Sequence, residues 1–203
     1  MKFKSIQERN YKLDNLLVST DWLSDNIDDK NLVLLDLDTK EEYIQSHIPG
    51  SINVIDNYYK TSLEDRTHVQ DIDQIKKTFN NLGITSESIV VGYDRSACLY
   101  SFRLAWVLHY YGHENVKVLD GGFPKWVYEK KSVEAGEITS NSKGDFHPKD
   151  PDPTIFSDKK TLIKILEDNE DIQILDVRSD DERNGINLRG GKWGGYIPKS
   201  VHK

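Results

Sequence analysis

The sequence predicts an α/β fold, a doubly wound parallel sheet with helices on both faces, followed by an incomplete second copy of that fold. Two short apolar runs, residues 31–36 and 89–92, do not alternate with polar residues, which is typical of strands buried on both faces. Helical patterns lie between the strands, and this order favours parallel strands joined by right-handed crossovers. An internal repeat between the two halves of the chain indicates the second copy.

The first elements carry local signals. Ser19 offers a capping oxygen ahead of an apolar pattern, which predicts a short helix that ends near Asp28. After the apolar strand at residues 31–36, the sequence predicts a helical turn at residues 41–45. Gly50 follows a proline and allows a sharp change of direction into a strand at residues 52–55.

The middle of the chain contains a polar stretch and a helix. Residues 57–69 are polar and charged, which indicates an excursion over the surface. Apolar residues then recur at helical spacing over residues 72–82, and Gly83 is expected to stop that helix. Residues 116–119 form a further short strand.

The segment around which the chain is organised reads as strand, tight loop and helix. The strand at residues 89–92 leads into small and polar residues from Asp94 to Cys98, and a helical pattern follows. Such a loop turns backbone N–H groups towards its own centre, and the helix N-terminus adds partial positive charge. We therefore expect a site that stabilises an anion or a thiolate.

Composition divides the chain into three parts. Residues 1–131 form the predicted first domain, and residues 132–154, rich in Ser, Asn, Gly, Lys, Asp and Pro, are expected to form a linker. Residues 155–203 then repeat the opening of the first domain. There Ser157 is expected to cap a helix, and a strand is expected at residues 172–177.

The repeat can be measured along the sequence. Asp36 and Asp176 lie 140 residues apart, whereas Pro49 and Pro198 lie 149 apart, so the second copy has nine more residues between these markers. Asp94 lies 58 residues after Asp36, which places its counterpart near position 243. The second domain is therefore expected to be present only as its opening part.

Composition also excludes several classes of function. The formal charge of -7 argues against a surface for nucleic acid or anionic membranes, and no long apolar run exists. The polar start of the chain is neither a secretory signal nor an anchor, so a cytoplasmic location is expected. One cysteine excludes an internal disulfide, and the histidine spacing suggests no metal site.

Two segments resemble the rhodanese family of sulfurtransferases, in the tandem form known as thiosulfate or 3-mercaptopyruvate sulfurtransferase. Residues 111–126 are similar to the family's stretch after the loop helix, and residues 47–53 are similar to its amino-terminal signature. In this family the nucleophilic cysteine directly follows the strand, where this chain has Asp94. The resemblance implies an inactive first loop and a working cysteine in the second domain, beyond residue 203.

Cys98 is the alternative nucleophile because it is the one sulfur nucleophile in the chain. It lies at or just inside the helix N-terminus, where the helix dipole is expected to lower the pKa of a thiol. The competing interpretation is a small, half-buried residue that packs the first helical turn. For Asp94, a role as general base is opposed by the repulsion between its charge and an anionic substrate.

Arginines near the two strand ends are candidates for substrate binding or for support of the loop. Arg95 is expected either to bind an anion or to pair with Asp94. Arg178 matches an arginine that the resemblance assigns to support of the active loop. Where some tandem members have a further substrate-binding arginine, this chain has Glu182.

The resemblance implies a sulfurtransferase that moves sulfane sulfur from a small donor to a thiophilic acceptor through a cysteine persulfide, without a cofactor. The alternative is a catalytically inactive module that interacts with partners or senses anions. A cysteine in the second loop would separate the two. Residues 155–203 are near the lower size limit for independent folding, so this segment is expected to dock on the first domain, to pair with another chain or to fray. Self-association through the incomplete second domain is one of these expectations.

Overall fold

The computed structural model describes residues 4–9, 15–54, 69–138 and 143–203. The chain divides into two compact units, unit 1 (Met1–Ile155) and unit 2 (Phe156–Lys203). The excursion expected at residues 57–69 lies almost wholly outside the described residues. Among the described residues, no helix has the length and apolar character needed to cross a bilayer.

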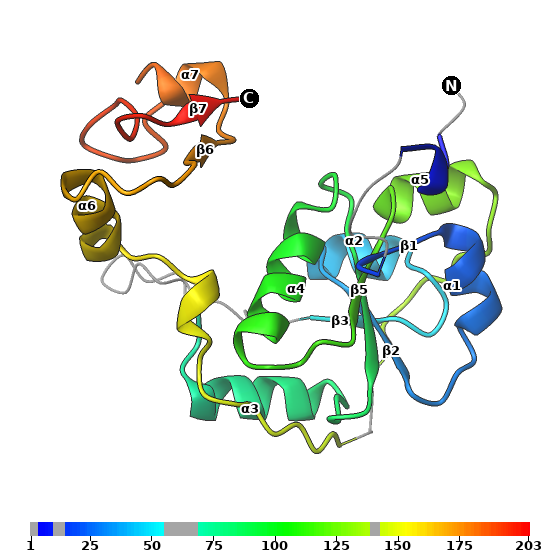
Figure 1. The fold of residues 1–203 in the computed structure, drawn as a ribbon. Helices are drawn as coiled ribbons and strands as arrows, with labels where there is room; N and C mark the ends of the chain where they lie inside the picture. Colours follow the sequence, from blue (N-terminus) through cyan, green and yellow to red (C-terminus); the bar gives the residue numbers. More distant parts are fainter. Residues whose placement is uncertain (1–3, 10–14, 55–68, 139–142) are drawn as a thin grey trace. The chain divides into compact units, whose positions relative to one another are not determined.

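Unit 1 contains a parallel five-stranded sheet, as predicted (Figure 1). Its order is β1-β5-β4-β2-β3, and every neighbouring pair is parallel. The strands are β1 (Leu17–Val18), β2 (Leu32–Asp36), β3 (Ile52–Asn53), β4 (Ile89–Tyr93) and β5 (Val116–Leu119). Only β1 was not predicted, because two residues carry too little pattern to be recognised.

Helices cover the sheet (Figure 1), and the first of them begins at the predicted cap. They are α1 (Thr20–Asn26), α2 (Lys40–Gln45), α3 (Ile72–Asn81), α4 (Leu99–Tyr110) and α5 (Gly122–Tyr128). Ser19 Oγ accepts the N–H of Trp22 at 3.0 Å, as its position predicts. Gly83 follows α3 with a φ of 77°, the left-handed conformation that glycine adopts most readily at a helix end.

Two apolar clusters show how the sheet is buried. Leu35 and Val90 belong to a cluster with residues of α3 and α4, whereas Leu34 and Val91 belong to a cluster with residues of α1 and α5. Successive strand residues therefore point to opposite faces, and both faces are covered. This arrangement explains why the strands are apolar without alternation.

Much of the expected linker packs on unit 1. His47 and Glu134 exchange backbone hydrogen bonds of 2.8 and 2.9 Å. The buried ring of Phe146 lies edge-on to Phe79, with ring centroids 5.2 Å apart. Through Phe146 this stretch contributes to the core of unit 1. The sequence did not predict this contact, because residues 132–154 are mostly polar.

Unit 2 contains α6 (Lys159–Glu167), β6 (Leu175–Asp176), α7 (Asp180–Arg183) and β7 (Val201–His202), with β6 parallel to β7. Asp158, and not Ser157 as expected, caps α6, because its carboxylate accepts the N–H of Thr161 at 2.7 Å. Within residues 156–203, all of which the structure describes, every residue as a whole is exposed or only partly buried. Unit 2 by itself therefore has no closed core.

Candidate active-site loop

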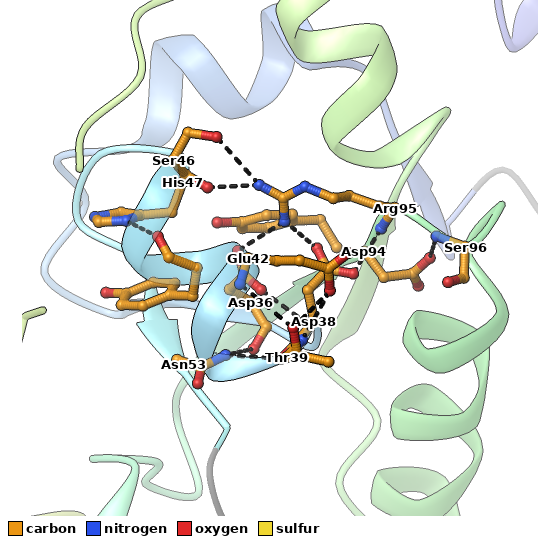
Figure 2. A network of polar contacts seen from close by, with 12 residues as sticks. Asp36, Asp38, Thr39, Glu42, Ser46, His47, Asn53, Asp94, Arg95 and Ser96 are labelled. Atoms are coloured by element: carbon orange, nitrogen blue, oxygen red, sulfur yellow. Dashed lines mark hydrogen bonds and ion pairs between the residues drawn. The ribbon is translucent and has the colours of Figure 1, made fainter. Parts of the chain in front are cut away.

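The loop from Asp94 to Cys98 connects β4 to α4 at the carboxyl edge of the parallel sheet, where the sequence predicted it. Ligands of open α/β sheets bind at this edge, because the loops that follow the strands gather there. Figure 2 shows Asp94, Arg95 and Ser96 beside the ends of neighbouring strands. The loop is therefore the candidate functional site of unit 1.

The carboxylate of Asp94 fills the centre of this loop. Its Oδ1 accepts the N–H groups of Ser96 at 2.8 Å and Cys98 at 2.9 Å. Its Oδ2 accepts the N–H and the hydroxyl of Ser101 at 2.8 and 2.5 Å. The side chain is fully buried, so the four donors serve an anion that belongs to the chain itself.

The backbone is bent to bring these donors together. Ala97 and Cys98 have φ values of 56° and 65°, in the left-handed region that costs a non-glycine residue about 1–2 kcal/mol. Gly122 lets α5 approach closely, because a Cβ at that position would lie 2.2 Å from the carbonyl oxygen of Asp94. That same carbonyl accepts the N–H of Phe123 at 3.1 Å.

Cys98 has the environment of a packed residue. Its thiol is buried and donates a hydrogen bond of 3.4 Å to the carbonyl of Leu119. Burial and then the charge of Asp94 raise the pKa of this thiol, so the expectation that the helix dipole lowers it is wrong. A protonated, buried thiol is a poor nucleophile, since the thiolate is the reactive form.

Arg95 ties the loop to the end of β2 and does not pair with Asp94 as one expectation had it. Its guanidinium forms an ion pair with Asp38, and its backbone N–H donates to the same carboxylate at 2.9 Å. Nη2 donates to the carbonyl of Ser46 at 2.5 Å, and the guanidinium lies 3.9 Å from the ring centroid of Phe123. Figure 2 shows the guanidinium between Ser46 and the two aspartates.

Sequence reasoning did not identify Asp36 and Asp38 as part of the site. Burial, only partly offset by hydrogen bonds to the carboxylate, raises the pKa of Asp36 to about 6. Burial also raises the pKa of Asp38 despite its contact with Arg95. The sequence does contain a signal for them, because two acidic residues lie two positions apart at the end of a strand. With one guanidinium for two carboxylates, this strand end has an excess of acidic groups.

The end of β6 in unit 2 has the opposite balance. Arg178 donates from Nε and Nη2 to the two oxygens of Asp176 at 2.9 and 2.8 Å, and from Nη2 to the carbonyl of Gly195 at 2.9 Å. Arg183 Nη1 donates to the same carboxylate at 3.1 Å. The hydrogen bonds from Arg178 are the main reason that the pKa of Asp176 lies below its ordinary value.

The remaining expectations concern isolated residues. Glu182 caps α7 together with Ser179 and forms an ion pair of 2.8 Å with Arg189. Over the described residues, no group of three or more His, Cys, Asp or Glu side chains is placed to hold a metal ion. Trp193 is 89% exposed, in the stretch where the second copy is longer.

Comparison with known proteins identifies the family. Residues 19–129 match the description "Rhodanese-like domain". A protein of Mycolicibacterium smegmatis named "Putative thiosulfate sulfurtransferase" is 29% identical over 174 residues, which cover 84% of this chain and 60% of that protein. A protein of Haloferax volcanii with the same name is 31% identical over 201 residues, which cover 91% of this chain and 67% of that protein.

Solved structures agree on the fold. The 3-mercaptopyruvate sulfurtransferase SseA of Escherichia coli aligns with a TM-score of 0.78 at 22% identity, over 93% of this chain and 74% of that one. Tum1 of Saccharomyces cerevisiae aligns with a TM-score of 0.78 at 19% identity, over 92% and 69%. The chain spans 60% of the length of the Mycolicibacterium relative. From its matched sequence and its parallel five-stranded sheet, the chain belongs to the rhodanese-like family.

Proposed function

We propose that this chain belongs to a sulfurtransferase of the thiosulfate:cyanide type whose persulfide cysteine lies beyond residue 203, near position 243. The observation that carries the proposal is the carboxylate of Asp94, which already takes the four donors at the centre of the loop in unit 1. A nucleophile of this reaction therefore has to lie in another loop. The name that both relatives carry, thiosulfate sulfurtransferase, supports thiosulfate as the donor.

The reaction transfers one sulfur atom twice, first from the donor to the cysteine and then from the cysteine to the acceptor. A cysteine thiolate attacks the sulfane sulfur of thiosulfate, the bond between the two sulfur atoms of the donor breaks, and sulfite leaves with the electron pair. The terminal sulfur of the persulfide then passes to cyanide or another thiophile, and the thiolate is restored. Converging backbone N–H groups stabilise the negative charge at each stage, and no cofactor takes part.

Unit 2 supplies the charge that this reaction needs. Thiosulfate is an anion, and the end of β6 has two guanidiniums for one carboxylate, whereas the end of β2 has the reverse. Arg178 is held by Asp176 and Gly195, so its part in the proposal is to support the loop that follows the neighbouring strand. Small molecules at a cytoplasmic site, and neither nucleic acid nor membrane, are the partners in this proposal.

The second candidate is a catalytically inactive module that interacts with partners. The same filled loop favours it, because Asp94 leaves unit 1 without a free centre for a persulfide. The two candidates differ in whether a second loop with a cysteine completes the protein.

Cyanide-dependent formation of thiocyanate from thiosulfate tests the proposal. The 203-residue chain is expected to show negligible turnover, and Cys98→Ser is expected to change it little, because the thiol is buried and lies four residues beyond the loop's first position. A longer form with a cysteine near position 243 is expected to turn over, and serine at that cysteine is expected to abolish activity. Robust turnover by the short chain that is lost on Cys98→Ser would place the nucleophile in unit 1 and overturn the proposal.

A further inference from the structure

We infer that His113 is a pH-sensitive latch, which holds the segment of residues 144–152 on unit 1 and releases that segment when its imidazole takes up a proton. The segment lies in the last part of unit 1, before unit 2 begins at Phe156. Its release lengthens the unattached connection between the two units. The latch does not depend on the proposed sulfur transfer, and its test measures local opening.

The 144–152 segment is attached through backbone hydrogen bonds near the ends of two helices. Phe146 donates its N–H to Oδ1 of Asn80, near the end of α3, at 2.5 Å. Lys149 donates its N–H to the carbonyl of Tyr111, the residue after α4, at 3.0 Å. Both N–H groups exchange with solvent when the segment opens, so they report its attachment.

The ring of Phe146 is the apolar anchor of this segment. Among the described residues of 131–155 it is the only one that is buried. The ring lies edge-on to Phe79, with ring centroids 5.2 Å apart, and edge-on to His113, with ring centroids 5.9 Å apart. The segment therefore depends on one apolar site, and His113 forms part of that site.

His113 has a buried nitrogen without a partner. The residue is 5% exposed, and its Nε2 has no hydrogen-bond partner in the described part of the chain. Since Nε2 has none, Nδ1 carries the hydrogen bonds to the backbone of Ser88 and Asn115. Burial lowers the pKa of His113, although these hydrogen bonds favour the proton. A proton on Nε2 would place an unpaired charge in an apolar site.

The charges around His113 do not compensate such a proton. His109 of α4 also lowers the pKa of His113 through its charge. The other charged residues that adjoin its contacts are exposed, so water screens them; they are Lys76, Glu87, Glu114, Asp145, His147 and Lys149. A protonated imidazole is therefore stabilised mainly by contact with water, which requires the site to open.

Protonation of His113 favours the released state. In the attached state the ring is kept neutral, whereas in the released state it is in water and has its ordinary pKa of 6.5. The attachment is therefore undiminished above pH 6.5 and weakens as the pH falls below that value, because the released state binds the proton more tightly. Between pH 7.5 and pH 5 the ratio of released to attached segment can rise by up to about thirtyfold, the limit set by the ordinary pKa.

Hydrogen–deuterium exchange of the full 203-residue chain tests the latch. The measured quantity is the protection factor of the N–H groups of Phe146 and Lys149, which removes the direct effect of pH on the chemical exchange rate. From pH 7.5 to pH 5 this protection is expected to fall by about tenfold to thirtyfold. At both pH values it is expected to be lower than the protection in β4, because the opening is local.

Two histidine variants separate the latch from other effects of acid. His113→Asn keeps an N–H donor near the position of Nδ1 and does not titrate, so its protection is expected to change by less than about threefold between the two pH values. His147→Asn removes an exposed histidine beside Phe146 and is the matched control. It is expected to keep the pH dependence of the unmodified protein.

Nuclear magnetic resonance of the imidazole gives a second readout that needs no variant. In the unmodified protein His113 is expected to titrate below pH 6.5, with the proton of its neutral form on Nδ1. Titration of His113 at or above pH 6.5 while the segment stays protected overturns the inference. So does a pH dependence that persists in His113→Asn, one that disappears in His147→Asn, or protection of the segment equal to that of β4.

Discussion

The ends of β2 and β6 are built on one plan and differ in charge. In unit 1 two carboxylates, Asp36 and Asp38, share the guanidinium of Arg95. In unit 2 one carboxylate, Asp176, is shared by two guanidiniums. The difference teaches that the same local fold can be made to repel or to attract an anion by exchanging side chains at the strand end.

The two units also correspond in the residues that stabilise these strand ends. Thr39 and Glu42 form a capping box at α2, and Ser179 and Glu182, 140 residues later, form one at α7. The hydroxyl of Tyr43 donates to the carbonyl of Ser51 at 2.6 Å, and its ring stacks on His47.

In unit 2 the counterpart of Tyr43 is Arg183, which makes the equivalent contacts by different chemistry. Its Nη2 donates to the carbonyl of Ser200 at 3.2 Å, and its guanidinium lies 3.9 Å from the ring centroid of Tyr196. An aromatic pair in unit 1 thus corresponds to a cation–π pair in unit 2. The contacts are therefore equivalent in the two units, but Arg183 adds a positive charge where unit 1 has the neutral Tyr43.

The largest expected effect tests whether unit 1 has a buried core and unit 2 does not. Phe79→Ala in unit 1 is expected to lower the free energy of unfolding by about 3–5 kcal/mol, because it empties a fully buried site beside Phe146. Ile163→Ala in α6, where the side chain is 43% exposed, is expected to change it by less than about 0.5 kcal/mol. Denaturant unfolding followed by circular dichroism measures both. Equal losses would show that unit 2 is buried in solution.

The next effect concerns the anion in the loop. Asp94→Ala is expected to destabilise unit 1 by about 3 kcal/mol, because it leaves buried N–H donors of Ser96, Cys98 and Ser101 without an acceptor. Asp25→Ala, at an exposed position of α1, is the control and is expected to be nearly neutral. Differential scanning calorimetry compares the two. An unchanged melting temperature for Asp94→Ala would show that the carboxylate does not hold the loop together.

The smallest effect is a difference in pH dependence between Asp36 and Asp176. The pKa of Asp36 is raised from 3.8 to about 6, so the folded state binds its proton more tightly than the unfolded state does. Its contribution to stability is therefore full below pH 3.8 and is lost as the pH rises to about 6, by roughly 2–3 kcal/mol. Asp36→Asn is expected to remove this loss, so its stability relative to the unmodified protein rises between pH 4 and 6.

Asp176→Asn is the matched control for that measurement. Its pKa is lowered, so its contribution to stability is present above its ordinary value of 3.8 and is lost only as the pH falls below it. Between pH 4 and 6 the difference between this variant and the unmodified protein is expected to stay flat. Unfolding in urea at several pH values gives both curves. Parallel curves for the two variants would contradict the contrast between the strand ends.

The sequence by itself determined the features that depend on neighbours along the chain. Local signals predicted the strands β2, β4 and β5, the N-cap of α1, the glycine that ends α3 and the loop from Asp94 to Cys98. These signals are apolar runs, capping residues and turns within a few positions. These signals suffice because a helix or a buried strand imposes its period locally. The acidic residue Asp94 directly after the apolar run of β4 can also be seen from the sequence alone.

Only the tertiary structure decided which groups meet across the fold. Arg95 binds Asp38, 57 residues away, and not its neighbour Asp94. The thiol of Cys98 lies against the carbonyl of Leu119 in a buried site, so desolvation outweighs the helix N-terminus and raises its pKa. The physical reason is that pKa shifts, ion pairs and burial depend on distances in space, and folding sets those distances by packing elements that are far apart in sequence.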